Sequence, residues 1–187
     1  MIIAVPDACV LYPPSLRDLL LRIAATGAYE PRWTDAIQAE WVRHVLSDNP
    51  EVSQAQLERT CRLMEQFYPN GSVSGYEVHI PNLILPDLHD RHVLAAAIQA
   101  TARYIVTFNL SDFPDSVTGL HNIEAIHPDL FLGALFDDEP ERFLRGVRSD
   151  RSALKNPPKT PQDYIDTLIA NRLTELSLRI DANRDAI

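Results

Sequence analysis

Short apolar runs alternate with amphipathic helical segments along the first two thirds of the chain. Consecutive apolar residues predict short buried strands, and apolar residues spaced by three or four predict the helices that cover them. The strands are predicted at residues 2–5, 104–107 and 119–126. Helices are predicted to begin at Ser15, Thr34 and Asp87, with another at residues 52–68. We therefore predict a mainly parallel sheet of about four or five strands flanked by helices, a three-layer α/β/α sandwich.

Residues 72–85 follow neither period clearly. Two short apolar pieces, Val78–Ile80 and Leu83–Leu85, are interpreted as extended segments.

After His127-Pro128 the pattern is helical throughout. Helices are predicted at 130–136 and 141–154, and a strong helix start follows at Thr160, Pro161 and Asp163. Two short helices then run to the end, where the last residues are expected to fray. We divide the chain into residues 1–127, an α/β domain, and residues 128–187, a helical extension. The extension is expected to serve packing or partner contacts rather than chemistry.

Four arginines recur at a spacing of three in the extension. Successive positions differ by about 60° around a helix, so the four spread over half of its surface. A solvated helix face is the favoured interpretation, and contact with RNA or a partner is the alternative. They are Arg142, Arg145, Arg148 and Arg151.

Composition narrows the class of protein. The 187 residues are 45% hydrophobic and 23% charged, as in globular proteins, and the net charge of −9 argues against broad adhesion to nucleic acid or membranes. No apolar run reaches membrane-spanning length, and the N-terminus lacks the pattern of a signal peptide. Cys9 and Cys61 fit no metal or redox spacing. We expect a cytoplasmic protein with no membrane partner.

Acidic residues occupy the positions where an α/β fold builds a site. Asp7 follows the first strand, and Asp112 lies in the loop after the strand at 104–107. Glu40 lies beside the inner face of its helix, and Asp90 precedes Val93 and Leu94 by three and four residues, so it shares their inward-facing stripe. The carboxyl ends of parallel strands meet at one edge of the sheet, so these acids are expected to converge.

Clustered carboxylates repel one another and resist ionisation together. Hard divalent cations relieve this repulsion, and oxygen ligands alone favour Mg²⁺ or Mn²⁺ over zinc or copper. Asp7, Glu40, Asp90 and Asp112 are therefore the candidate metal ligands and catalytic residues. Asp87 and Asn109 are further candidates, although Asp87 also suits a helix cap and Asn109 a turn. Metal ions held by carboxylates suit phosphoryl chemistry.

Four segments in this order resemble the PIN domain, most closely that of VapC-like toxins with a helical C-terminal extension. They begin at Asp7, Glu40, Leu85 and Thr107, and read DACVLY, EW, LPDLHDRHVLAAA and TFNLSDF. The resemblance covers about residues 1–127 well and the extension more loosely. It implies a Mg²⁺- or Mn²⁺-dependent ribonuclease with an RNA substrate, often a homodimer and inhibited by a cognate antitoxin protein. Asp7, Glu40, Asp90 and Asp112 match the acids of the family, and Asn109 matches a position that is Asp or Asn.

Two residues depart from the pattern of the family. Cys9 stands where asparagine, serine or threonine is common, so weaker hydrogen bonding beside Asp7 is expected. Pro6 replaces an apolar residue and is expected to end the first strand early, because proline cannot donate a ladder hydrogen bond.

Two other classes of protein compete with a nuclease. A phosphotransfer fold also gathers acids around Mg²⁺, but it needs a lysine at a late strand end or an Asp-x-Asp motif, and this chain has neither. A catalytically silent PIN fold that acts through protein contacts stays open. A Mg²⁺-dependent nuclease assay separates it from an enzyme.

Overall fold

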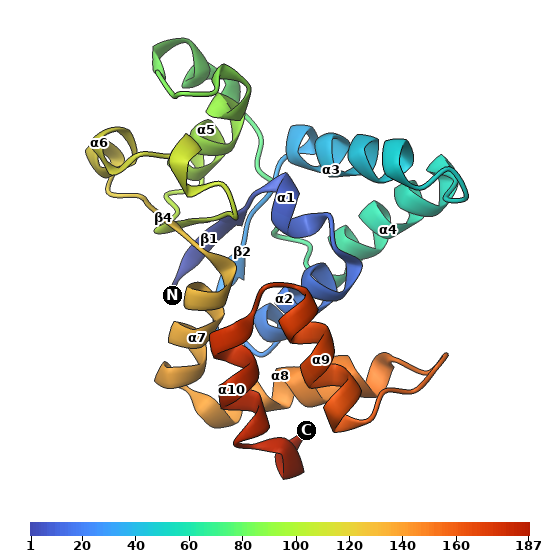
Figure 1. Ribbon diagram of the computed structural model, residues 1–187. Helices are drawn as coiled ribbons and strands as arrows, with labels where there is room; N and C mark the ends of the chain where they lie inside the picture. Colours follow the sequence, from blue (N-terminus) through green and yellow to red (C-terminus); the bar gives the residue numbers. More distant parts are fainter.

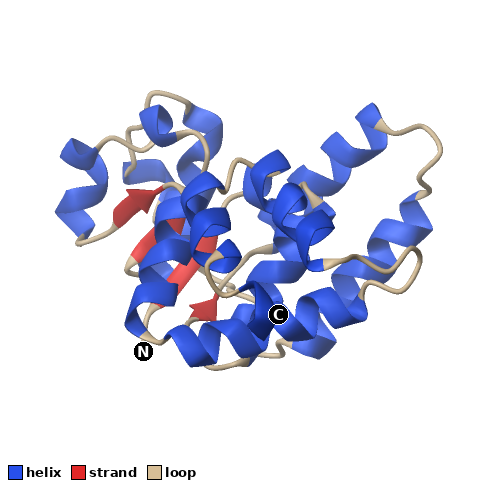
Figure 2. Cartoon of the chain, turned by 60° about the horizontal axis from the view of Figure 1, so that its bottom comes forward, coloured by secondary structure: helices blue, strands red, loops and turns tan.

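The computed structural model describes all 187 residues and is built around a four-stranded parallel sheet (Figure 1). The strand order is β2-β1-β3-β4, with β1 and β3 in the centre. The strands are short: β1 Ile3–Pro6, β2 Glu30–Pro31, β3 Tyr104–Val106 and β4 Glu124–Ile126. Helices enclose the sheet (Figure 2). The predicted α/β/α fold with a mainly parallel sheet and a helical C-terminal part is confirmed.

The helices come in two groups along the chain. The first group precedes or lies between the strands: α1 Ala8–Leu11, α2 Pro14–Ala25, α3 Asp35–Asp48, α4 Gln54–Phe67, α5 Arg91–Gln99 and α6 Asp115–Thr118. The second follows β4 without interruption by strands: α7 Pro128–Asp138, α8 Pro140–Ala153, α9 Pro161–Ala170 and α10 Thr174–Asp181. None of them has the length and apolar character that crossing a bilayer requires.

Each face of the sheet has its own hydrophobic core. Neighbouring strand residues point to opposite faces, so Ala4 and Val106 join one core, and Val5 and Ile105 join the other. The first core is filled mainly by α2 and the C-terminal helices, and the second mainly by α3, α4 and α5. This division produces the three layers.

Pro6 does not shorten the first strand, contrary to expectation. Even-numbered residues of β1 bond to β2, as Ala4 O accepts from Arg32 N, and odd-numbered residues bond to β3, as Asp7 N donates to Val106 O at 2.9 Å. Pro6 faces the side where β2 has already ended, so the missing N–H leaves no partner unsatisfied. The strand therefore carries Asp7 to the edge of the sheet.

Several predicted helix starts are confirmed, and one is wrong. Thr34 and Thr160 cap α3 and α9 with their side chains, and Thr160 forms the reciprocal pair with Asp163. Helix α2, however, begins at Pro14 rather than after Ser15. The Ser15 hydroxyl instead accepts a hydrogen bond from Asn171 Nδ2 at 2.9 Å, so a contact with the C-terminal helices uses the side chain that the sequence offered as a cap.

The predicted extended pieces at Val78–Ile80 and Leu83–Leu85 are wrong. Residues 76–78 and 80–82 form 3₁₀ turns, and residues 83–85 belong to no strand. Only Leu83 and Leu85 are buried among these apolar residues, while Ile84 is 79% exposed. Anchoring by two isolated leucines leaves the segment as a covering loop rather than a sheet strand.

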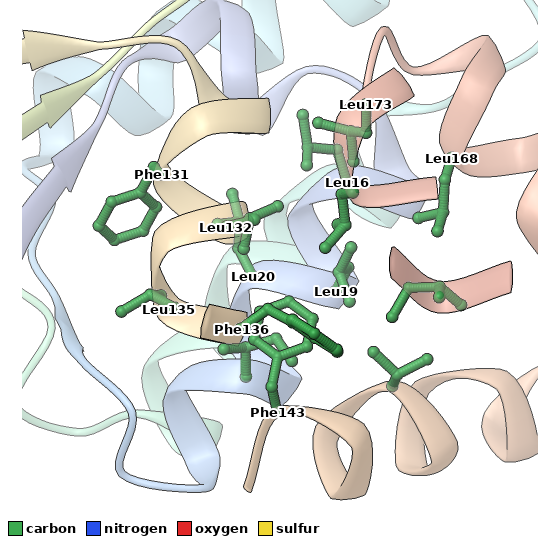
Figure 3. Close-up of a cluster of buried hydrophobic side chains, with 14 of the residues drawn as sticks. Leu16, Leu19, Leu20, Phe131, Leu132, Leu135, Phe136, Phe143, Leu168 and Leu173 are labelled. Atoms are coloured by element: carbon green, nitrogen blue, oxygen red, sulfur yellow. The ribbon is translucent and has the colours of Figure 1, made fainter. Parts of the chain in front are cut away.

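The C-terminal helices share a core with the α/β part (Figure 3). Figure 3 shows leucines of α2 packed against phenylalanines of α7 and α8 and against leucines from the last two helices. The chain end is also fixed: Ile187 is 8% exposed and belongs to this core, so the expected fraying is wrong.

The row of four arginines on α8 makes mostly internal contacts. Arg142 donates to Gly27 O, Arg148 to Ala186 O, and Arg151 to Lys159 O and Ile187 O. Arg145 alone makes no hydrogen bond or ion pair. Three of the four therefore hold the extension to itself or to the turn after α2.

Candidate functional site

Asp7 is held at the carboxyl end of β1 by three hydrogen-bond donors. Its Oδ1 accepts from the Ala8 N–H at 2.6 Å, which caps α1, and its Oδ2 accepts from Thr107 Oγ at 2.8 Å. The Cys9 thiol donates to the same Oδ2 at 3.1 Å. The side chain is only 4% exposed, and its burial raises the pKa of Asp7 above the ordinary value despite these bonds. Asp7 is thus a buried acid in a fixed orientation.

Cys9 joins the two central strand ends. Its sulfur lies 3.5 Å from Thr107 Oγ and accepts from the Phe108 N–H at 3.5 Å, in addition to bonding Asp7. Burial and the Asp7 charge raise the pKa of the Cys9 thiol to about 12, so it stays protonated and keeps donating. Cys9 therefore supplies a hydrogen bond at a position where a weaker contact was expected.

Glu40 reaches the site from α3 and is oriented by a histidine of α5. Glu40 Oε2 lies 3.1 Å from His92 Nε2, and this bond holds the pKa of Glu40 below its ordinary value. Both side chains are half-buried, and His92 Nδ1 is buried without a partner. Because a carboxylate only accepts hydrogen bonds, Nε2 is the donor of this bond.

Asp90 and Asp87 differ in their hydrogen bonding at the start of α5. Asp87 Oδ1 accepts from the His89 N–H at 2.8 Å and so caps the 3₁₀ turn of residues 88–90 that leads into the helix. Asp90 takes the N-cap position of α5 itself, yet its side chain makes no capping bond. The predicted cap is confirmed, and the Asp90 carboxylate is left free.

The loop after β3 brings Asn109 and Asp112 to the same edge. The Asn109 N–H donates to Thr107 Oγ at 3.0 Å, so the hydroxyl that binds Asp7 also anchors this loop. Asp112 ends a 3₁₀ turn of residues 110–112 and is half-buried, with only a long 3.4 Å contact from Ser111. Asn109 is exposed and makes no side-chain hydrogen bond.

Asp90 lies within electrostatic range of the other predicted acids. Partial burial, together with the negative charges of neighbouring acids, raises the pKa of Asp90 to about 6. These neighbours are Asp7, Asp87, Asp112 and Glu40. No three His, Cys, Asp or Glu side chains lie close enough together to form one direct coordination sphere. The predicted acids therefore lie within electrostatic range of Asp90, without a group of three close enough to bind one ion directly.

Three residues that position the acids were not predicted as part of the site. Thr107 and Cys9 fix Asp7, and His92 fixes Glu40. Thr107 is the last residue of the predicted strand 104–107 and Cys9 lies two residues after Asp7, so both could have been found from their places near the strand ends. His92 lies 52 residues from Glu40, and only the packing of α3 against α5 brings them together.

The comparisons with known proteins agree with this geometry. Residues 4–111, more than half of the chain, match the PIN domain family, and residues 128–181 match the VapC50 C-terminal domain. A Mycobacterium tuberculosis protein named "Putative ribonuclease VapC50" is 37% identical over 103 residues, which cover 54% of this chain and 61% of that protein. No solved structure matched. The chain belongs to the PIN-domain family and is VapC-like, with a C-terminal extension of the VapC50 type.

Proposed function

We propose that this protein is a metal-dependent endoribonuclease that hydrolyses phosphodiester bonds of RNA at the edge where its acids meet. The observation that carries the proposal concerns Asp90. Its carboxylate makes no hydrogen bond, is half-buried and faces four other acids. Because such a cluster opposes its own ionisation, it is typical of a site used for chemistry rather than for stability. The name of the M. tuberculosis relative supports the same activity.

The donor set fits Mg²⁺ or Mn²⁺. Asp7, Glu40, Asp90 and Asp112 offer only carboxylate oxygens, which these ions prefer. Mg²⁺ usually keeps several waters and takes one or two carboxylates directly, so the wide spacing of the acids suits a hydrated ion. Asp87 and Asn109, which are exposed, would contribute through water. A bound ion would lower the pKa of a water molecule and offset the charge of the attacked phosphate.

The protein's own residues provide orientation. Three donors hold Asp7, and His92 holds Glu40, so these two carboxylates cannot turn away from the edge. Asp90 and Asp112 keep oxygens that no strong hydrogen bond occupies. Two fixed acids and two available ones would place an ion and the reacting phosphate with little reorganisation.

We further propose that the enzyme is the cytoplasmic toxin of a toxin–antitoxin pair, with a cognate antitoxin protein as inhibitor and a homodimer as the working form. Membership of the VapC-like PIN family supports these partners. We place the boundary between the nuclease domain and the extension between residues 127 and 128. The start of the C-terminal family match at residue 128 supports this division. A neighbouring gene product that copurifies with the chain and blocks RNA cleavage would support the pairing, and cleavage that every such product leaves unchanged would count against it.

Substitution of Asp90 tests the activity. Asp90→Asn keeps the shape of the side chain and removes its charge, so RNA cleavage in Mn²⁺ or Mg²⁺ should fall by about a hundredfold or more with the fold intact. Asp87→Asn is the matched control, because asparagine also caps helices. Its rate of RNA cleavage should fall by less than about tenfold. Circular dichroism checks that both variants are folded.

Two outcomes would contradict the proposal. If Asp90→Asn cleaved RNA as fast as the wild type, the site would be wrong. If the folded wild type cleaved no RNA in either ion, a silent PIN fold that acts through protein contacts would be the better description.

A further inference from the structure

The arginines of the C-terminal extension divide into bonded and unbonded ones. Residues 128–187 contain seven arginines. Five donate to carbonyls or acids of the same chain: Arg142, Arg148, Arg151, Arg179 and Arg184. The other two, Arg145 and Arg172, are exposed and make no side-chain hydrogen bond or ion pair. Only these two have guanidinium groups that make no hydrogen bond at all.

Arg172 is fixed above an aromatic ring, whereas Arg145 has no such contact. The guanidinium carbon of Arg172 lies 4.7 Å from the ring centroid of Phe108, and the same ring meets His127 edge-on at 5.2 Å. A guanidinium stacked on an aromatic face is held by the cation–π attraction, while its N–H groups stay free at the rim of the plane. The stack therefore presents a positioned cation and leaves its hydrogen-bonding edge open.

The backbone holds Arg172 in this place. It follows the end of α9 with φ of 63°, a left-handed conformation in which glycine or asparagine is usual. Its neighbours are anchored on both sides: Asn171 Nδ2 donates to Ser15 Oγ at 2.9 Å, and Leu173 is fully buried. A bulky residue in a costly conformation between two anchors indicates that the side chain, rather than the turn, is what the position requires.

Phe108 connects this stack to the acids. It lies between Thr107, whose hydroxyl binds Asp7, and Asn109, and its own N–H donates to the Cys9 sulfur that also binds Asp7. Arg172 forms no ion pair with these acids. Its stacking on Phe108 places a separate positive group against the loop that also carries Asn109.

The protein carries a net charge of −9, so an RNA backbone finds few favourable places on it. Guanidinium groups bind phosphate through two parallel N–H bonds, and arginine stacked on an aromatic ring is a common element of single-strand binding. We infer that Arg172, stacked on Phe108, binds a backbone phosphate of single-stranded RNA that flanks the cleaved bond. This inference rests on the proposed ribonuclease function and names a substrate contact from the extension, which had been expected to serve only packing or partners.

Arg172→Gln tests the contact, with Arg145→Gln as the matched control. Each removes one exposed, unbonded positive charge from the same extension and keeps a long polar side chain. Affinity for a fluorescent single-stranded RNA oligonucleotide is measured by anisotropy over a range of salt concentrations, and KM and kcat are measured for cleavage of the same RNA. Arg172→Lys, which keeps the charge but loses the fork of donors, is the third variant.

One lost phosphate contact has a defined signature. For single strands it lowers the slope of log affinity against log salt by about 0.7, which corresponds to about fivefold weaker binding at about 0.1 M salt. We expect Arg172→Gln to show this weakening in anisotropy and in KM, with kcat and melting temperature unchanged. The RNA affinity of Arg172→Lys should lie between that of Arg172→Gln and that of the wild type. The RNA affinity of Arg145→Gln should equal that of the wild type.

The outcomes separate this inference from the proposed function. Equal affinity and equal salt slope for Arg172→Gln and Arg145→Gln would overturn the inference, whether or not the wild type cleaves RNA. Absence of cleavage by the wild type would overturn the proposed function, and the anisotropy comparison would still decide the role of Arg172. A lower melting temperature of Arg172→Gln with an unchanged salt slope would assign the stack to packing alone and reject the inference.

Discussion

At the scale of single residues, Asp90 should make the stability of the ion-free protein depend on pH. Its pKa in the folded chain is about 6, above the ordinary value of 3.8. Between these two values the folded state binds more protons than the unfolded state, so stability falls as pH rises from about 4 to above 6. Below about pH 4 the Asp90 carboxyl is protonated in both the folded and the unfolded state, so it does not lower the stability of the protein.

Asp90→Asn should remove this part of the dependence. In chelator, the variant should melt at a higher temperature than the wild type at pH 7.5 and at the same temperature near pH 4. Adding Mn²⁺ at pH 7.5 should raise the melting temperature of the wild type more than that of the variant, because a bound ion stabilises the folded state. Burial also raises the pKa of Asp150 to about 6. Asp150 is present in both proteins, so its contribution to the pH dependence cancels when the two are compared. A variant with the same melting temperature as the wild type across this range would contradict the electrostatic description of the site.

The positions of the acids could be predicted from the sequence, but their hydrogen-bond partners could not. Asp7 follows a strand and Asp90 precedes an inward-facing stripe, and both facts depend on local pattern alone. The pairing of Glu40 with His92 depends on how α3 and α5 pack, for which periodicity gives no register. The roles of the acids as metal ligands stay predictions.

At the scale of elements, the contact between α2 and α8 should be sensitive to a single methyl group. A Cβ at Gly146 would lie 2.6 Å from Ile23 Cδ1 and 3.2 Å from the Arg22 carbonyl oxygen. The side chain of Ile23 can turn, but the backbone of α2 cannot yield without moving the helix. Gly146→Ala should therefore destabilise the protein by about 1–3 kcal/mol in urea unfolding, although alanine favours helix.

Gly119→Ala is the control for this prediction. A Cβ at Gly119 would meet nothing within 4 Å, so the variant should unfold with nearly the same midpoint as the wild type. Equal midpoints for both variants would show that α8 can move away from α2 at little cost.

Helices and central strands could be predicted well because each has a strong period or a clear cap. Residues 76–85 could not, since their apolar residues follow no single period: Leu83 and Leu85 are buried, whereas Tyr76 and Ile80 are only partly buried against the same core. The start of α2 was misplaced for a related reason, because Ser15 has the chemistry of a cap but is used for a contact with Asn171. Local propensity fails where a tertiary contact competes for the same side chain.

At the scale of the whole molecule, the extension and the α/β part share one buried core. The sequence pattern changes from mixed to helical at residue 128, which is where a division could be predicted. The pattern cannot show that Leu16, Leu19 and Leu20 of α2 need the later helices as their covering layer (Figure 3). The division in sequence therefore does not imply two units that fold separately.

Removal of residues 156–187 tests this dependence. The deleted segment contributes seven members of the core on one face of the sheet: Tyr164, Ile165, Leu168, Leu173, Leu176, Ile180 and Ile187. Their loss would expose the apolar face of α2 and leave a core too small for its layer, at a cost of about 1.5–3 kcal/mol for each large side chain. Since whole domains are stable by only about 5–15 kcal/mol, we expect residues 1–155 to lose cooperative urea unfolding.

Two point variants test the contribution of the shared core to stability without a deletion. Leu173 is fully buried, so Leu173→Ala should cost about 2–5 kcal/mol, whereas Leu178→Ala, at a side chain 61% exposed, should stay within about 0.5 kcal/mol of the wild type. Cooperative unfolding of residues 1–155 at the full-length midpoint would show that the α/β part is complete by itself. RNA cleavage by that truncated chain would then be governed by the acidic edge alone, and the shared core would carry no consequence for the site.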